Sequence, residues 1–197
     1  RLLRDRYGLP GPRIREGIGD DAAVLRPGRT GEYLLVTTDM LLEGIDFRRE
    51  WTDPRSLGRK SIAVNLSDLA AMGARPRFFT VSLAVPSDLT ERWLLRFYDG
   101  LTDPAWCAGA RLIGGDLSHS DGTISISVAA MGESVGRKVV YRHGGRPGDF
   151  VYATGALGQS AAGLRLLEAG CVRPGSGPRR EAVRAHRSPQ ARTGEGM

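Results

Sequence analysis

Short apolar runs rich in β-branched residues alternate with helical patterns along most of this chain, and glycine or proline separates them. The runs occupy residues 33–37, 78–85, 111–113, 124–130 and 150–153, and they predict strands. Apolar residues at helical spacing predict helices over residues 57–72, 88–101 and 159–169. Strands and helices mixed in this order predict an α/β (α+β) domain, with a mixed sheet flanked by helices.

The ends of two predicted helices carry recognisable signals. Asp88 followed by Glu91 resembles a capping box at the start of the second helix, and Pro104 is expected to end or kink that helix. The third helix follows a glycine-rich loop at residues 154–158 and is expected to stop at Gly170.

Four aspartates next to apolar segments are the most informative polar residues: Asp21, Asp39, Asp68 and Asp116. Asp39 and Asp116 directly follow strand-like runs, and ligands of α/β sheets gather at the carboxyl ends of strands. Converging carboxylates would repel by roughly 4 kcal/mol per pair at 4 Å, so such a cluster requires cations, and magnesium suits carboxylate oxygens. Any one of these acids taken alone is explained better by a turn or a helix cap, and only the four together favour a site.

The formal net charge is +6, and much of the excess lies in an arginine-rich stretch after Cys171. Acids are abundant elsewhere, so the stretch is interpreted as a solvated linker, with a nucleic-acid-binding arm as the alternative. No segment approaches the roughly 20 apolar residues of a membrane span, and the charged first residues do not form a signal peptide. We therefore expect a cytoplasmic protein with no membrane partner, in which Cys107 and Cys171 are free thiols.

Five blocks in order, at residues 17–23, 37–39, 63–74, 112–116 and 154–164, resemble the motif series of thiamine-monophosphate kinases. That family belongs to the aminoimidazole-ribonucleotide-synthetase-like superfamily, and the similarity runs from about residue 13 to the end of the chain. The resemblance implies the superfamily's N-terminal domain fold, a homodimer, and two ligands, ATP and thiamine monophosphate. The chain has no P-loop motif, which excludes that route to phosphoryl transfer.

The resemblance also implies roles for individual residues. Carried over by motif, the magnesium ligands would be Asp21, Thr38, Asp39, Asp68 and Asp116, with Thr37 supplying a further oxygen. Gly115, Asp116 and Arg142 would contact ATP, since glycine lets the backbone approach a nucleotide and a guanidinium forks onto phosphate. The implied reaction moves the terminal phosphoryl group of ATP to thiamine monophosphate with no catalytic protein nucleophile, and gives thiamine diphosphate.

The chain departs from the family at two places. Asp46 stands where a substrate-contacting histidine is usual, so Asp46 is a candidate substrate-binding residue. Because the residue type differs from that of the family, the assignment of the substrate is weaker.

The second departure is the length of the chain. We predict an ATP- and magnesium-binding domain at residues 1–135 and the start of a truncated C-terminal domain at residues 136–197. The chain alone is therefore expected to have little activity. Two alternatives remain: another ATP-dependent enzyme of the superfamily, such as a selenophosphate synthetase or aminoimidazole ribonucleotide synthetase, or a non-catalytic basic nucleotide- or nucleic-acid-binding fragment.

Overall fold

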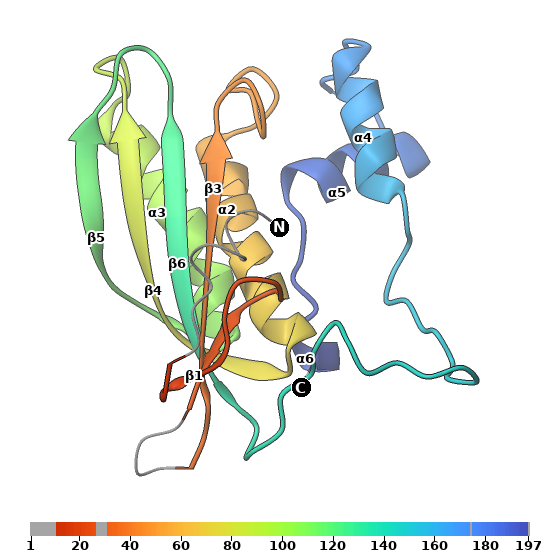
Figure 1. The fold of residues 1–197 in the computed structure, drawn as a ribbon. Helices are drawn as coiled ribbons and strands as arrows, with labels where there is room; N and C mark the ends of the chain where they lie inside the picture. The colour runs from red at the N-terminus through yellow and green to blue at the C-terminus, as the bar shows by residue number, and fades with distance from the viewer. Residues whose placement is uncertain (1–10, 27–30, 174, 197) are drawn as a thin grey trace.

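The computed structural model describes residues 11–26, 31–173 and 175–196. A six-stranded sheet lies on one side of the molecule with two long helices behind it, and α4 and α5 stand apart from it (Figure 1). No helix of the described segments is long and apolar enough to cross a bilayer. The elements in chain order are β1 (Ile14–Glu16), β2 (Ala23–Leu25), β3 (Leu34–Leu42), α2 (Pro54–Ala71), β4 (Ala74–Val85), α3 (Glu91–Cys107), β5 (Arg111–His119), β6 (Ser125–Ser134), α4 (Gln159–Glu168), α5 (Pro178–Arg187) and α6 (Thr193–Gly196).

The strand order in the sheet is β1-β2-β3-β6-β4-β5. Neighbouring strands are antiparallel except β4 and β5, which run parallel and are joined through α3. A parallel pair requires such a crossover connection, and a helix is the usual one. The prediction of a mixed sheet flanked by helices is therefore confirmed.

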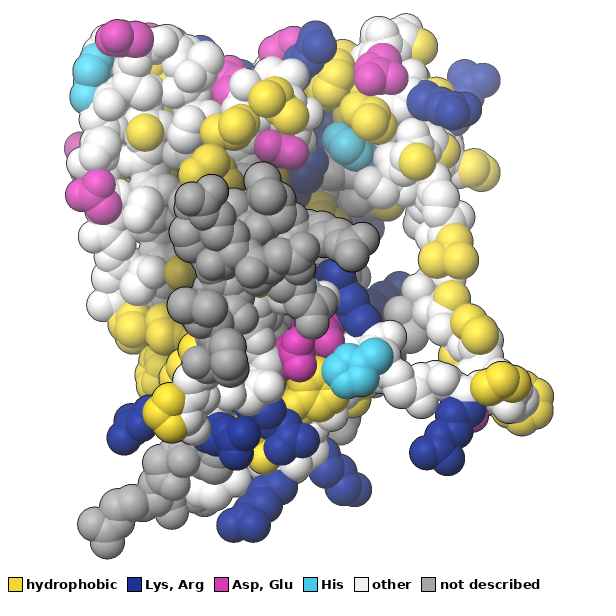
Figure 2. Space-filling view, in the orientation of Figure 1, with side chains coloured by type: hydrophobic (Ala, Val, Ile, Leu, Met, Phe, Trp, Pro, Cys, Tyr) yellow, Lys and Arg dark blue, Asp and Glu magenta, His cyan; other side chains and the backbone are white. Residues whose placement is uncertain are grey.

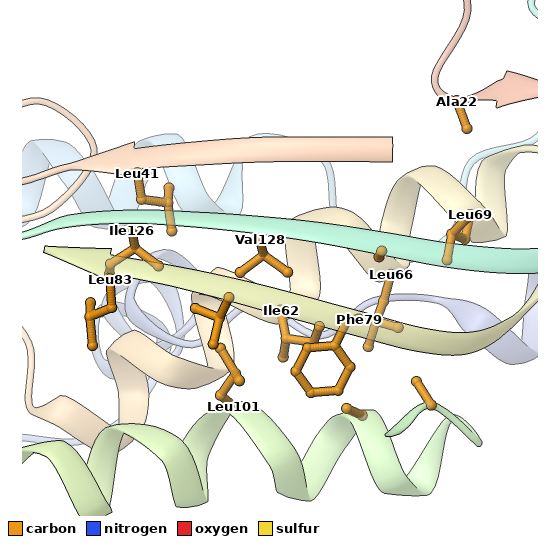
Figure 3. Packing of buried hydrophobic residues seen from close by; sticks show 14 of the residues in the cluster. Ala22, Leu41, Ile62, Leu66, Leu69, Phe79, Leu83, Leu101, Ile126 and Val128 are labelled. Carbon is orange, nitrogen blue, oxygen red and sulfur yellow. The ribbon is translucent and has the colours of Figure 1, made fainter. Parts of the chain in front are cut away.

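The sheet has one buried face and one open face, because side chains alternate along each strand. In β6 every second residue from Ile126 to Ala130 is buried, and the residues between them are partly exposed. The buried side chains pack against α2 and α3, as Figure 3 shows for Ile62 and Leu66 of α2 and for Leu101 of α3. The core thus lies between the helical layer and one face of the sheet, and no helix of the described residues packs against the other face.

Helices α2 and α3 cross at a point where each contributes a glycine. A Cβ atom at Gly58 would overlap the backbone carbonyl of Phe97, and one at Gly100 would overlap the carbonyl of Arg55. Only glycine lets two helix backbones approach this closely. Both helices begin with side-chain caps: Asp53 accepts hydrogen bonds from the first turn of α2, and Thr90 accepts one from Trp93 in α3.

Several sequence predictions about the elements are wrong. Residues 150–153 form no strand, because no neighbouring strand in the described chain pairs with them, and Phe150, Val151 and Tyr152 are exposed. The stretch after Cys171 is not a solvated linker: it forms α5, which buries Ala182 and Val183 where it packs on α4. The short strands β1 and β2 carry no clear alternation and were missed.

The start and end of α3 also differ from the prediction. The cap is Thr90, whereas the carboxylate of Asp88 accepts a hydrogen bond from Arg49 at 2.9 Å. Pro104 does not end the helix, which continues to Cys107. The residue after this proline, Ala105, is fully buried, so packing against the core offsets the loss of one helix hydrogen bond.

Candidate functional site

Three of the four motif aspartates lie near one another on the helix side of the sheet. Asp21 lies in the turn before β2, Asp39 in the middle of β3, and Asp68 in the last turns of α2. Buried Thr37 joins two of these elements, because its hydroxyl donates a hydrogen bond of 2.7 Å to Asp68 Oδ2. On the face shown in Figure 2, acidic side chains lie together beside a histidine and several basic side chains.

Two of these carboxylates, Asp68 and Asp39, are partly buried in neighbouring positions. Burial raises the pKa of Asp68, the hydrogen bond from Thr37 opposes that rise, and the charges of Asp39 and Asp21 add to it. Burial also raises the pKa of Asp39, with a further contribution from the charge of Asp46. The site therefore holds more negative charge than its surroundings neutralise, which favours a cation.

Arg142 provides the positive charge nearest to this group. Its guanidinium pairs with the carboxylate of Asp21, and its backbone N–H donates to Asp20 Oδ2 at 3.1 Å. The side chain of Asp20 is only 2% exposed and also accepts a hydrogen bond from the backbone of Asp21. Asp20 thereby ties the segment that carries Arg142 to the turn that carries Asp21.

A second contact holds the same segment in place. Arg15 donates to the hydroxyl of Tyr141 at 2.8 Å and to the hydroxyl of Tyr33 at 2.6 Å. Tyr141 in turn stacks on His143, with 5.1 Å between ring centroids. The sequence predictions missed both Asp20 and Arg15. Asp20 is adjacent to Asp21 in the first motif block and could have been included, whereas nothing in the local sequence marks Arg15.

Asp46, the predicted substrate-binding residue, is engaged in the turn that follows β3. Its carboxylate accepts a hydrogen bond of 2.8 Å from the backbone N–H of Leu42, and its carbonyl accepts one of 2.6 Å from Lys60 Nζ. This carboxylate is close enough to Asp39 to raise the pKa of that group. Asp46 therefore borders the acidic site while shaping the loop beside it.

The remaining predicted residues lie away from the acidic site, and Thr38 and Asp116 are on the other face of the sheet. Across the sheet, Asp39 of β3 is in register with Gly115 of β5, with strands β6 and β4 between them. Asp116 lies on the open face, as does Ser82, its partner in β4. Three strand spacings of about 4.8 Å place β3 and β5 roughly 14 Å apart. Thr38 also faces the open side and donates to the carbonyl of Val128 at 3.0 Å. Within one chain, Thr38, Gly115 and Asp116 are thus separated from the acidic site.

Asp116 and Gly115 also have their own local surroundings. Asp116 accepts a hydrogen bond of 2.9 Å from Ser118 and lines a hollow of about 160 Å³ with Met40 and Ser127. A Cβ at Gly115 would overlap the carbonyl of Val81, so glycine is required there by the close approach of β4. Both aspartates that were expected at strand ends, Asp39 and Asp116, lie inside strands.

The donor set of the acidic site fits magnesium in its chemistry. Asp21, Asp39 and Asp68 offer carboxylate oxygens and Thr37 a hydroxyl oxygen, which are the ligand types that this ion prefers. Throughout residues 11–26, 31–173 and 175–196, no three His, Cys, Asp or Glu side chains already stand close enough to grip one ion.

The raised pKa of Asp39 predicts a specific dependence of stability on pH. The folded chain holds a proton on Asp39 more tightly than the unfolded chain, so this group stabilises the fold only when it is protonated. That contribution is complete below the ordinary pKa of 3.8 and is lost as the pH rises through the raised folded value. Asp39→Asn is therefore expected to raise the melting temperature at about pH 7, with a smaller gain toward pH 3.

Thermal unfolding followed by circular dichroism, with a chelator present, measures this difference between wild type and variant. Asp121→Asn is the matched control, because Asp121 lies fully exposed in the turn between β5 and β6. A lower melting temperature for Asp39→Asn at neutral pH would contradict the raised pKa.

Comparison with known proteins identifies relatives of this chain. The family model for AIR synthase related protein, N-terminal domain, matches residues 19–134, more than half of the chain. The thiamine-monophosphate kinase of Synechococcus elongatus is 42% identical over 176 residues, which are 88% of this chain and 52% of that protein. These matches confirm the resemblance inferred from the five motif blocks.

Solved structures match over nearly the whole chain. AaThiL complexed with AMPPCP and TMP has a TM-score of 0.86 at 34% identity, covering 99% of this chain and 59% of that one. Thiamine-monophosphate kinase from Stenotrophomonas maltophilia K279a has a TM-score of 0.78 at 39% identity, covering 100% and 63%. The chain spans about half the length of the curated relatives it matches. The protein belongs to the family of AIR synthase related proteins, of which it carries the N-terminal domain.

Proposed function

We propose that this chain is the ATP- and magnesium-binding part of a thiamine-monophosphate kinase. The observation that carries the proposal is the convergence of Asp21, Asp39 and Asp68 beside Arg142, from three motif blocks far apart in the sequence. The relatives named thiamine-monophosphate kinase and the AaThiL complex with AMPPCP, a non-hydrolysable analogue of ATP, support the same activity.

In the proposed reaction, a phosphate oxygen of thiamine monophosphate attacks the terminal phosphorus of ATP. The bond from that phosphorus to the bridging oxygen breaks, and ADP leaves. Asp21, Asp39 and Asp68 would hold magnesium, whose charge offsets the repulsion between the two anions. Arg142 carries a guanidinium that can fork onto phosphate oxygens, and Asp20 and Arg15 hold its segment in place.

Calorimetric titration with AMPPCP, with and without magnesium, tests this function in the chain and in the full-length protein. The proposal expects binding in the full-length protein that requires magnesium, followed by ADP release with ATP and thiamine monophosphate. Absent or metal-independent nucleotide binding in the full-length protein would overturn it. ADP release with a different acceptor only would instead favour another enzyme of the superfamily.

A second domain is part of the same proposal, beginning near residue 136. Beyond β6 the chain continues without strand or helix to α4, and Phe150, Val151, Tyr152 and Leu157 on this segment are each more than 80% exposed. Hydrophobic side chains along the outlying segment are visible in Figure 2. Apolar residues this exposed are normally covered by another part of the folded protein, which a second domain would supply.

We also propose that the open face of the sheet is the surface of a homodimer. Leu34, Met40 and Phe78 are exposed on this face, and large apolar side chains gathered on one surface mark an interaction site. Since Asp116 lies on the same face and Gly115 precedes it in β5, the proposal assigns their nucleotide contacts to the assembled dimer. Asp21, Asp39 and Asp68 remain the cation ligands within each chain.

Phe78→Arg is expected to weaken the dimer by roughly 100-fold or more, because a charged side chain would be buried without a partner. Analytical ultracentrifugation over a range of concentrations measures the change. Leu95→Arg is the matched control, since Leu95 is similarly exposed but lies on α3, on the helical side of the sheet. Equal dimerisation of wild type and Phe78→Arg would exclude this face as the interface.

A further inference from the structure

A cavity of about 390 Å³ lies on the helical side of the molecule, away from the acidic site. It opens to solvent and is lined by α2, α3, the end of α5 and the segment of residues 188–193. Its volume is in the range typical of small-molecule pockets. None of the proposed magnesium ligands lines this cavity, so it is distinct from the site described above.

One wall of the cavity combines an arginine with an apolar surface. Arg59, Ala63 and Leu66 follow each other at helical spacing along α2, and all three line the cavity. Arg59 Nε is buried and has no hydrogen-bond partner among the described residues. A buried guanidinium N–H without an acceptor is unfavourable, and an anionic ligand would satisfy it.

The charges around the cavity also favour an anion. Arg184 of α5 lines it as a second guanidinium. The acid in its wall, Asp103, is already paired with Arg55, with 2.5 Å between Asp103 Oδ2 and Arg55 Nη2. The other residues that line the cavity are apolar or uncharged, and they include Pro104, Ala108 and Pro189. The cavity therefore pairs positive charge with apolar surface.

We propose that this cavity binds a small organic anion, a carboxylate or a phosphate monoester attached to an apolar body of about the size of an aromatic ring. The anionic group would accept hydrogen bonds from Arg59 and Arg184, and the apolar body would lie against Leu66 and Pro104. This binding site is independent of the proposed kinase activity, because it shares no residue with the acidic site.

Cys107 gives a direct measure of occupancy, because this exposed free thiol lines the cavity whereas Cys171 does not. Alkylation of each cysteine by iodoacetamide can be followed by peptide mass spectrometry with four probes of similar shape: benzoate, phenyl phosphate, benzamidine and benzyl alcohol. At a concentration four times the Kd, an occupant should slow alkylation of Cys107 about fivefold by mass action. The expected result is protection of Cys107 by the two anions only, with Cys171 unaffected.

Two arginine variants test the role of charge. Arg184→Gln changes an exposed side chain, and Arg59→Gln removes the buried N–H group; both should abolish the protection. Arg165→Gln on α4 is the control, because Arg165 is exposed and lies outside the cavity. Protection by benzoate but not phenyl phosphate assigns a carboxylate ligand, and the reverse assigns a phosphate. Equal protection by benzamidine or benzyl alcohol, no protection by either anion, or full protection in both variants would each overturn the proposal.

Discussion

Gly100→Ala is expected to lower the free energy of unfolding by at least about 2 kcal/mol. The added methyl group would meet the backbone around the carbonyl carbon of Arg55, which cannot rotate away as a side chain could. Helices α2 and α3 would have to separate, and this would disturb the core that both helices share with the sheet. The loss outweighs the gain of about 1 kcal/mol that alanine brings inside a helix. Urea unfolding followed by circular dichroism measures the change.

Gly145→Ala is the matched control, because nothing lies near its added methyl group and its backbone does not adopt a positive φ. Its free energy of unfolding should stay within about 0.5 kcal/mol of wild type. If Gly100→Ala were as stable as this control, the two helices could not be packed as closely as the structure places them. Gly58→Ala should repeat the loss from the opposite side of the contact.

Asp68→Asn is expected to reduce magnesium-dependent binding of AMPPCP in the full-length protein by roughly 100-fold, about 3 kcal/mol. The amide keeps the shape of the side chain and an oxygen that can accept the hydrogen bond from Thr37, so the fold should persist. It removes the charge that would hold the cation. Because burial raises the pKa of Asp68, the variant should also melt at a higher temperature near neutral pH when no metal is present.

This pair of effects distinguishes a functional carboxylate from a structural one. Loss of nucleotide binding together with loss of stability would indicate that Asp68 serves only the fold. Asp121→Asn should change neither the nucleotide affinity nor the melting temperature. Calorimetry and thermal unfolding on the same preparations provide both measurements.

The local sequence predicted the elements that carry a strong pattern. The predicted strands include β3, β4, β5 and β6, and the predicted helices correspond to α2, α3 and α4. These elements are predictable because their apolar residues repeat at the period of a strand or a helix. The prediction failed for residues 150–153, where a strand-like composition has no partner, and for α5, whose arginines conceal the short apolar stripe of Ala182 and Val183. A strand forms only where another strand pairs with it, and α5 is stabilised by its packing on α4. The sequence of the segment alone specifies neither contact.

The motif residues themselves were determined by the sequence, since each block supplies oxygen donors or an arginine suited to magnesium and phosphate. Their grouping was decided only by the tertiary structure. Alternation along β3 turns Thr37 and Asp39 toward α2 and Thr38 away from it, and the position of β5 carries Asp116 to the open face. Asp20 and Arg15 act through contacts with residues 122 and 126 positions away, Arg142 and Tyr141. Contacts between residues more than 100 positions apart depend on the path of the whole chain. Side-chain chemistry and local spacing in the sequence do not specify that path.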